Sequence, residues 1–199
     1  MEAGIMKVRE RSDLRAGLWP VLLGLVIGSL IGAGVAVATH GGNPINCGAN
    51  PCSGTNGADD IYGDGNANNI FAHDSDDYAE GNGAADEING GQNGDWLTGG
   101  QGYDTIYGGP GADFVPNFIN GLDGGDGADN LHGEDGRDRL VGDEGQDDMW
   151  GGNYDDDLYG NADADHLRGG DGFDYLDGGA HVDTCEGGAG NDVKVDCEN

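Results

Sequence analysis

The sequence predicts an all-β protein built as a parallel β-solenoid, and three observations support this fold class. Short units recur every nine residues through residues 54–195. Each unit opens with turn-forming glycines and closes with three residues centred on one apolar side chain. Apolar residues make up only 36% of the chain, and within the units they concentrate at that one position. Short units of fixed period that stack on one another bury a narrow, continuous core, which is typical of solenoids.

The units follow the pattern G-G-x-G-x-D-x-U-x, in which U is a large apolar residue, and we number its positions one to nine. Seven units follow one another from Gly54 and eight from Gly124, and a seven-residue unit, 117–123, separates the two runs. We expect this short unit to form a capped or bulged coil that interrupts one edge, with a hinge or partner site as the alternative. Position eight is aliphatic, alanine or methionine in thirteen of the fifteen full units.

The order of residues within a unit favours a cation site. Glycines at positions one, two and four permit a tight turn whose carbonyl groups converge. Position six then adds a carboxylate in every full unit except the one that carries Asn68. Because Ca²⁺ prefers six to eight oxygen ligands, one turn offers about half a site. A second turn must supply the other ligands.

Two units make one coil of strand, turn, strand and turn, so that turns eighteen residues apart stack at the spacing of neighbouring strands, about 4.8 Å. One predicted column contains Asp59, Asp77, Asp95, Asp113, Asp129, Asp147, Asp165 and Asp183. The other contains Asn68 at its head, followed by Asp86, Asp104, Asp138, Asp156, Asp174 and Asp192. Carboxylates at that spacing repel one another and therefore require cations.

The fifteen tandem units resemble the repeats-in-toxin, or haemolysin-type calcium-binding repeat, family over residues 54–195. The resemblance implies a right-handed parallel β-roll that binds several Ca²⁺ ions between successive turns on both edges and folds only when they bind. The aspartates of both predicted columns match the ligand position of that family one by one. Weaker sites are implied where units depart from the pattern, as at Asn68, Tyr154, Asp163 and His181 and in the glycine-free unit 72–80.

The N-terminal residues 1–38 have the features of an export segment. Residues 18–38 are an uninterrupted apolar stretch, preceded by Lys7 and three arginines. About 20 apolar residues are enough to span a bilayer as a helix, and Ala36-Val37-Ala38 has the small-x-small form of a signal cleavage site. The segment is predicted to be a cleaved signal peptide, with a retained anchor as the alternative. Either way the repeats are expected outside the cell, secreted or anchored to the outer face of the cytoplasmic membrane.

Four cysteines lie at the two ends of the repeats. Cys47 and Cys52 fall in a linker, 39–53, while Cys185 and Cys197 lie near a C-terminal cap, 196–199. In an exported protein this clustering favours two disulfides, Cys47 with Cys52 and Cys185 with Cys197, among the three possible pairings. A four-cysteine zinc site is the alternative, and it would require distant ends to meet.

Charge and composition narrow the function. Residues 1–38 hold four of the 8 basic and three of the 38 acidic residues, which leaves the remainder with a net charge near −31. Such a chain is not expected to bind nucleic acid or an anionic membrane, and any membrane contact would run through residues 18–38. The serines outside the export segment lie in no nucleophile motif, so no enzyme is expected. The sequence favours a secreted or surface calcium-binding protein that folds on Ca²⁺, with a small calcium-dependent adhesin as the alternative and its protein or glycan partner not indicated.

Overall fold

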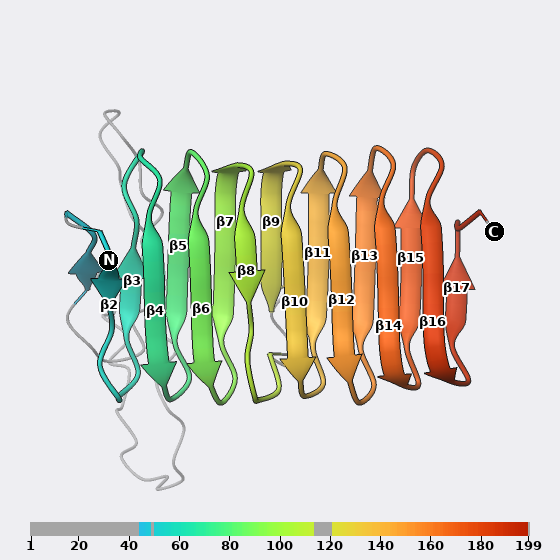
Figure 1. Ribbon diagram of the computed structural model, residues 1–199, viewed down its shortest axis with the longest axis horizontal. Helices are drawn as coiled ribbons and strands as arrows, with labels where there is room; N and C mark the ends of the chain where they lie inside the picture. The colour runs from blue at the N-terminus through green and yellow to red at the C-terminus, as the bar shows by residue number, and fades with distance from the viewer. Residues whose placement is uncertain (1–43, 49, 114–120, 199) are drawn as a thin grey trace, which may run out of the picture. The chain divides into compact units, whose positions relative to one another are not determined.

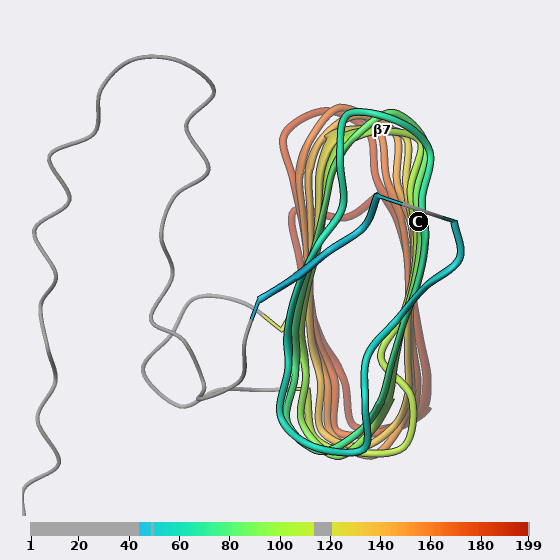
Figure 2. The same ribbon diagram turned by 90° about the vertical axis from the view of Figure 1, so that its left-hand side faces the viewer.

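A computed structural model describes residues 44–48, 50–113 and 121–198, all of which belong to one compact unit. The secondary structure of these residues is entirely β, and two parallel sheets face each other across a thin core (Figures 1 and 2). The chain alternates between the sheets, so odd-numbered strands form one sheet and even-numbered strands the other. The all-β parallel solenoid predicted from the sequence is therefore confirmed.

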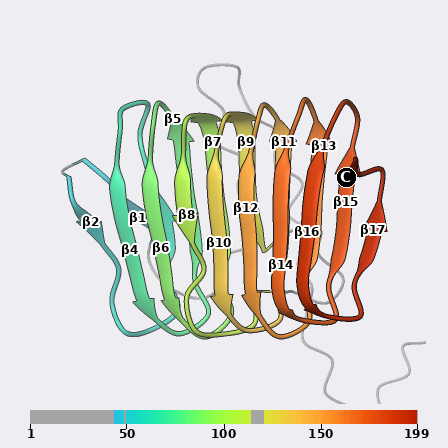
Figure 3. The same cartoon turned by 45° about the vertical axis from the view of Figure 1, so that its right-hand side comes forward.

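The nine-stranded sheet follows the chain order of its strands. These are β1 (Ile45–Asn46), β3 (Asp60–Tyr62), β5 (Tyr78–Gly83), β7 (Trp96–Gly102), β9 (Leu122–Gly127), β11 (Arg139–Glu144), β13 (Asp157–Ala162), β15 (Tyr175–Gly179) and β17 (Val193–Val195). The eight-stranded sheet contains β2 (Cys52–Ser53), β4 (Asn69–Asp74), β6 (Glu87–Gln92), β8 (Thr105–Tyr107), β10 (Asn130–Asp135), β12 (Asp148–Asn153), β14 (His166–Gly172) and β16 (Thr184–Gly190). Figure 3 shows both rows of strands obliquely.

Most strands are longer than the three residues that the x-U-x segment predicts. They begin at position seven and run on into positions one to three of the next unit, as β10 does from Asn130 to Asp135. The glycines at the start of a unit thus pair with the neighbouring coil before the chain turns, as Gly152 does with Glu134 and Gly170. The turn itself is confined to the middle of each unit.

The core is one file of position-eight side chains from each sheet. Ile61, Leu97, Leu131 and Leu158 are examples, and each is fully buried. Partners in register lie directly above one another, so Leu131 packs between Ile106 and Met149. Because each side chain contacts its own kind one coil away, the core is as long as the roll and only two side chains thick.

The seven-residue unit predicted at 117–123 is wrong. Leu122, not Val115, occupies the core position after Asp113, since it pairs with Leu97 on one side and Leu140 on the other. Paired residues are 25 apart in the sequence across this point, against 18 in the coils on either side, so the chain gains seven residues between Asp113 and Gly121. Proline lacks the N–H that an interior strand needs, and Pro116 directly follows Val115. Val115 itself lies outside the described residues.

Both pairs of cysteines form the disulfides that the sequence favours. Cys47 bonds to Cys52 and Cys185 to Cys197, with Cα–Cα distances of 5.3 and 5.7 Å. The C-terminal pair lies beside Lys194, whose ammonium group donates a hydrogen bond of 2.8 Å to the carbonyl oxygen of Cys185. Lys194 therefore closes the core position of the last strand with a charge that reaches solvent, as expected for a cap.

The outer face of the eight-stranded sheet carries a row of stacked planar groups at position nine. His132 lies between Tyr107 and Trp150, with ring centroids 4.9 and 4.5 Å away and interplanar angles of 14° and 2°. The guanidinium of Arg168 continues the row 5.2 Å above the ring of Trp150 and pairs with Glu186 at 3.4 Å. The ring faces of His132, Tyr107 and Trp150 therefore cover one another.

The predicted export segment, 18–38, lies outside the described residues. Within the described part of the chain, no helix is long and apolar enough to cross a membrane.

Candidate metal centres

The position-six side chains lie at the two edges of the roll, where each turn meets the strand that follows it. All are buried except Asp192, which is partly exposed. Each of these side chains except the first in its row stacks directly on the position-six residue of the preceding coil. The main-chain N–H of the preceding position-six residue donates to Oδ1 of the next, at distances from 2.7 Å for Asp59 to Asp77 up to 3.3 Å for Asp174 to Asp192.

These hydrogen bonds define two ladders. The first contains Asp59, Asp77, Asp95, Asp113, Asp138, Asp156, Asp174 and Asp192. The second contains Asn68, Asp86, Asp104, Asp129, Asp147, Asp165 and Asp183.

The predicted columns are therefore wrong beyond Asp113. Asp113 donates to Asp138, not to the predicted neighbour Asp129, and Asp104 donates to Asp129. The prediction counted residues 117–123 as half a coil, whereas the extra residues lie inside one unit and leave the alternation of edges unchanged. The expectation that this segment interrupts one edge is also wrong, because both ladders continue across it.

The second carboxylate oxygen of most ladder residues is buried without a partner. Within the described part of the chain, Oδ2 accepts no hydrogen bond in Asp77, Asp86, Asp95, Asp104, Asp113, Asp129, Asp138, Asp147, Asp156, Asp165, Asp174 and Asp183. Burying an unpaired polar atom costs on the order of 1–3 kcal/mol, and more for a charged group. Twelve such atoms in one small protein indicate that something besides the chain satisfies them.

Burial raises the pKa of most of these carboxyl groups, because it disfavours the charged form more than the ladder hydrogen bonds favour it. The pKa rises to about 6 for Asp77, Asp86, Asp138 and Asp165, to about 7 for Asp129 and Asp147, and to about 8 for Asp95, Asp113 and Asp156. Neighbouring ladder carboxylates add to the rise, as Asp138 does for Asp113. Without a cation, the edges therefore hold their charge at a cost.

The glycine at position one leaves open the space that these oxygens face. A Cβ placed on Gly133 would lie 2.5 Å from Oδ2 of Asp138 and 2.5 Å from the carbonyl oxygen of Gly151, one coil further on. A Cβ placed on a position-one glycine of other units would meet the same two oxygens, one from the aspartate of its own turn and one from a carbonyl group of the next coil. This holds for Gly90, Gly142, Gly151, Gly160 and Gly169. Carboxylate and carbonyl oxygens are the ligands that Ca²⁺ prefers, so the donor set fits this ion.

Main-chain carbonyl groups must supply a large part of any site at these edges. In the described residues no three side chains of histidine, cysteine, aspartate or glutamate gather in a way that could hold a metal ion. Each turn contributes a single buried carboxylate, and turns lie a coil apart. A site between two turns would thus combine one or two carboxylates with carbonyl oxygens, as the sequence pattern predicts.

The position-two residue takes one of two backbone conformations. In thirteen of the fifteen full units it has a positive φ, with glycine in eight of them and residues such as Asn82, Glu134 and Asp143 in the others. Thr55 and Asp64 are the exceptions, and both lie in the first coil. Even the glycine-free turn of unit 72–80 keeps the common form, with φ of 89° at His73 and 96° at Ser75. Sequence reasoning missed this division, although β-branched Thr55 disfavours a positive φ.

Buried ladders of carboxylates that face main-chain carbonyls across glycine turns define a calcium-binding β-solenoid. Residues 53–88, 89–115, 123–158 and 159–193 match the family described as the RTX calcium-binding nonapeptide repeat. These matches cover most of the chain, which therefore belongs to that family. The repeats of this family bind Ca²⁺ at multiple sites, and the buried ladders fit that property. No curated protein matches the chain.

Proposed function

We propose that this protein is an extracellular calcium-binding protein whose roll folds when Ca²⁺ binds between its stacked turns. The observation that carries the proposal is the set of twelve buried Oδ2 atoms without hydrogen-bond partners in the described chain. A core two side chains thick is poorly placed to offset that many desolvated carboxylates. Ca²⁺ would replace an unfavourable contact with a favourable one where these unpaired oxygens lie.

The charge balance supports the coupling of binding to folding. The chain beyond residue 38 has a net charge near −31, and self-repulsion of this size opposes a compact state. Because each Ca²⁺ adds two positive charges, on the order of a dozen ions would cancel most of it. The sites need two adjacent turns and therefore do not exist in the unfolded chain, so binding free energy becomes folding free energy.

Three features support a location outside the cell. Residues 18–38 have the composition of an export segment, the chain forms two disulfides, and the ladder sites suit the higher calcium concentration there. N-terminal sequencing of the protein recovered from the culture medium would show a start after Ala38 if the segment is a cleaved signal. Recovery only in the membrane fraction with residues 18–38 intact would instead establish the helical anchor.

The direct test is a calcium titration of the full chain in a non-ionic detergent, followed by far-ultraviolet circular dichroism. We expect a cooperative transition from coil to β structure with Ca²⁺ but not with Mg²⁺, which demands a tighter octahedral site. Asp95→Asn, inside a ladder, should raise the calcium midpoint. Asp171→Asn removes the same charge from an exposed position near the end of β14 and serves as the matched control. A spectrum that is already β in chelator at neutral pH, or stays coil in calcium, would refute the proposal.

A second candidate function is calcium-dependent adhesion, and two exposed aromatic residues favour it. Tyr154 and Phe173 are 66% and 54% exposed on adjacent coils of one edge. The turns that carry them are joined by a 2.6 Å hydrogen bond from the N–H of Tyr154 to the carbonyl oxygen of Asp171. Adhesion predicts that replacing both aromatic residues with serine abolishes attachment of cells to a protein-coated surface while the calcium midpoint stays the same. Unchanged attachment would remove this candidate.

A further inference from the structure

The first turn of the roll satisfies its position-six carboxylate with protein groups. Oδ2 of Asp59 accepts hydrogen bonds from the main-chain N–H of Thr55 at 2.6 Å and from its hydroxyl group at 2.8 Å. The hydroxyl also contacts the carbonyl oxygen and the N–H of Gly57 at 3.3 and 3.2 Å. The Oδ2 atom that has no hydrogen-bond partner in most later turns therefore already accepts two hydrogen bonds from Thr55 in the first turn.

The second turn is closed in the same way. Asn68 replaces the aspartate, and its Oδ1 accepts a 2.8 Å hydrogen bond from the N–H of Asp64. The carboxylate of Asp64 in turn accepts from the N–H and the side-chain amide of Asn66, at 2.9 and 3.0 Å. Thr55 and Asp64 hold corresponding positions in these two turns, and both lack the positive φ found at position two elsewhere. This conformation directs the position-two N–H toward the position-six side chain.

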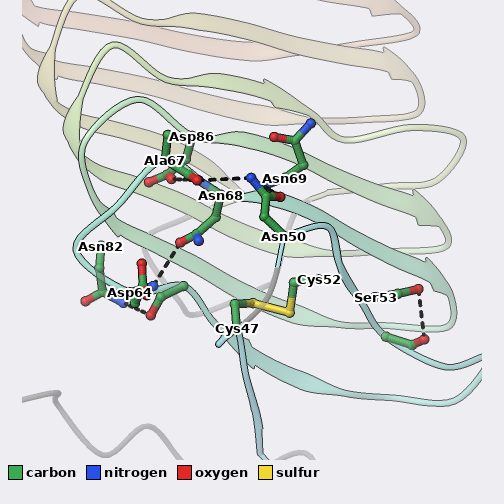
Figure 4. The surroundings of a disulfide bond; sticks show 12 residues. Cys47, Asn50, Cys52, Ser53, Asp64, Ala67, Asn68, Asn69, Asn82 and Asp86 are labelled. Atoms are coloured by element: carbon green, nitrogen blue, oxygen red, sulfur yellow. Dashed lines mark hydrogen bonds between the residues drawn. A yellow bond between two sulfur atoms is a disulfide. The ribbon is translucent and has the colours of Figure 1, made fainter.

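Side chains of the preceding linker fasten the first coil further. Asn50 donates to the carbonyl oxygen of Ala67 at 3.1 Å and accepts from the N–H of Asn69 at 2.8 Å. Figure 4 shows Asn50, Asn68 and Asn69 gathered beside the Cys47–Cys52 disulfide. Both sulfurs belong to the core, together with the fully buried Ile61 and Ile70. The coil thus has its own covalent link and apolar contacts.

The next turn in the chain, 72–77, rests on this coil through protein contacts as well. The hydroxyl of Ser53 lies 2.7 Å from Nε2 of His73, and the amide of Asn56 donates to Asp74 at 2.9 Å. Ala72 stands at position one, where the other fourteen full units all have glycine. An added Cβ at this position in other turns would meet the aspartate of the same unit, so the methyl group of Ala72 is expected to narrow the space beside Asp77.

We infer that residues 44–48 and 50–71 form a calcium-independent cap from which the calcium-dependent coils assemble toward the C-terminus. The inference rests on the proposed function and deepens it. The first two turns take no Ca²⁺ of their own, although Asp59 was predicted as a ligand. Because loop closure is the main cost of starting a solenoid, a cap held by a disulfide and protein hydrogen bonds gives the first ions a coil on which to bind.

The first test counts bound calcium ions per chain in the full-length protein by equilibrium dialysis and elemental analysis. Asp59→Asn is expected to leave the number unchanged, because its second oxygen serves Thr55. Asp95→Asn, at the same position two coils further along the same ladder, is expected to lose at least one ion. A loss in Asp59→Asn equal to that in Asp95→Asn would overturn the inference.

The second test needs no substitution and measures hydrogen exchange of the wild-type chain just below the calcium midpoint. The N–H groups of Gly54 and Thr55 should exchange more slowly than that of Asp148, which donates to Asp129 at 2.9 Å within the calcium-dependent coils. Equal rates, or slower exchange at Asp148, would overturn the inference. If circular dichroism shows no calcium-driven transition at all, the proposed function fails instead, so the two failures are distinguishable.

Discussion

The apolar file inside the roll and the two carboxylate ladders at its edges are built by the same repeat, yet their energetics are opposite. Both stack one kind of side chain at the spacing of a coil, and both are buried. A leucine gains from a leucine above it, because apolar surface leaves water on both sides. An aspartate loses, because Oδ2 gives up its hydration and meets another carboxylate instead.

This contrast locates the dependence on calcium. The inside of the roll needs nothing from solvent, and its stability should respond to side-chain volume alone. The edges respond to whatever neutralises a carboxylate, whether an ion or a proton. Each of the following predictions perturbs one region and leaves the other intact.

The largest effect is expected from pH in the presence of a chelator. Most of the ladder carboxyl groups have raised pKa values in the folded roll, about 6 for Asp86 and about 8 for Asp95, against 3.8 as the ordinary value. Protons therefore favour the fold: this stabilisation is complete below about pH 4 and is lost as the pH rises through 6 to 8. Far-ultraviolet circular dichroism should show β structure near pH 4.5 and coil near pH 8, both without calcium.

In saturating calcium the spectrum should show β structure at neutral pH and at pH 8 as well. Lowering the pH should raise the calcium midpoint, because protons compete with Ca²⁺ for the carboxylates. A chelated chain that is more folded at pH 8 than at pH 4.5 would contradict the assignment of the ladders as the unstable region.

A smaller effect is expected from the core. Leu131→Ala, between Ile106 and Met149, should lower the free energy of unfolding in saturating calcium by about 2–5 kcal/mol. Urea unfolding measures this, and Leu131→Met, which conserves volume, should cost less than about 1.5 kcal/mol. The number of bound ions should stay constant in both variants. If Leu131→Ala binds fewer ions than the wild type, the core and the ladders are not independent.

Filling the space beside one position-one glycine should lower the free energy of unfolding by less than truncating a core side chain does. A Cβ on Gly133 meets Asp138 and the carbonyl oxygen of Gly151, so Gly133→Ala should cost about 1–3 kcal/mol and lower the number of bound ions. Gly65→Ala is the matched control, since a Cβ there has no neighbour within 4 Å. If both variants bind the same number of ions as the wild type, the gap at position one is not part of the sites.

The smallest effect is expected from deleting residues 114–120, which joins Asp113 to Gly121 and restores the eighteen-residue coil. Both ladders and the core already continue across this point, so the free energy of unfolding should change by no more than about 1 kcal/mol. Urea unfolding of the deletion variant in saturating calcium measures this. A complete loss of folding would contradict the assignment of residues 114–120 as an insertion that the roll does not need.

The repeat pattern alone predicted most of the fold. The period placed Leu97 and Leu158 in the core and Asp95 and Asp156 at the edges, because a two-residue offset fixes which side chain points inward. Both disulfides followed from the clustering of the cysteines. The departures arose where a local choice had consequences further along the chain.

The register beyond Asp113 is the clearest of these departures. Val115 and Leu122 both fit position eight by residue type, and only the strand context decides between them: Pro116 cannot donate to an interior strand, whereas Asp123 is followed by two glycines. Counting the extra residues as half a coil then exchanged the edges of every later aspartate. The first coil was wrongly predicted for a different reason. The motif identifies Asp59 as a ligand, but it carries no information on the two hydrogen bonds that Thr55 donates to Oδ2 of Asp59.

The stacked row of Tyr107, His132 and Trp150 limits how the number of repeat units in this chain can change during evolution. Loss or duplication of one whole unit would exchange the edges of all later aspartates and continue each ladder with residues of the other. Each turn would still carry its position-six residue, so the calcium sites and the core would be unchanged. If the affected unit lies between Tyr107 and His132, the two residues would fall on opposite sheets and would no longer stack. Selection on the number of repeats would therefore act through the surface, and single-unit steps are expected only where no such row is interrupted.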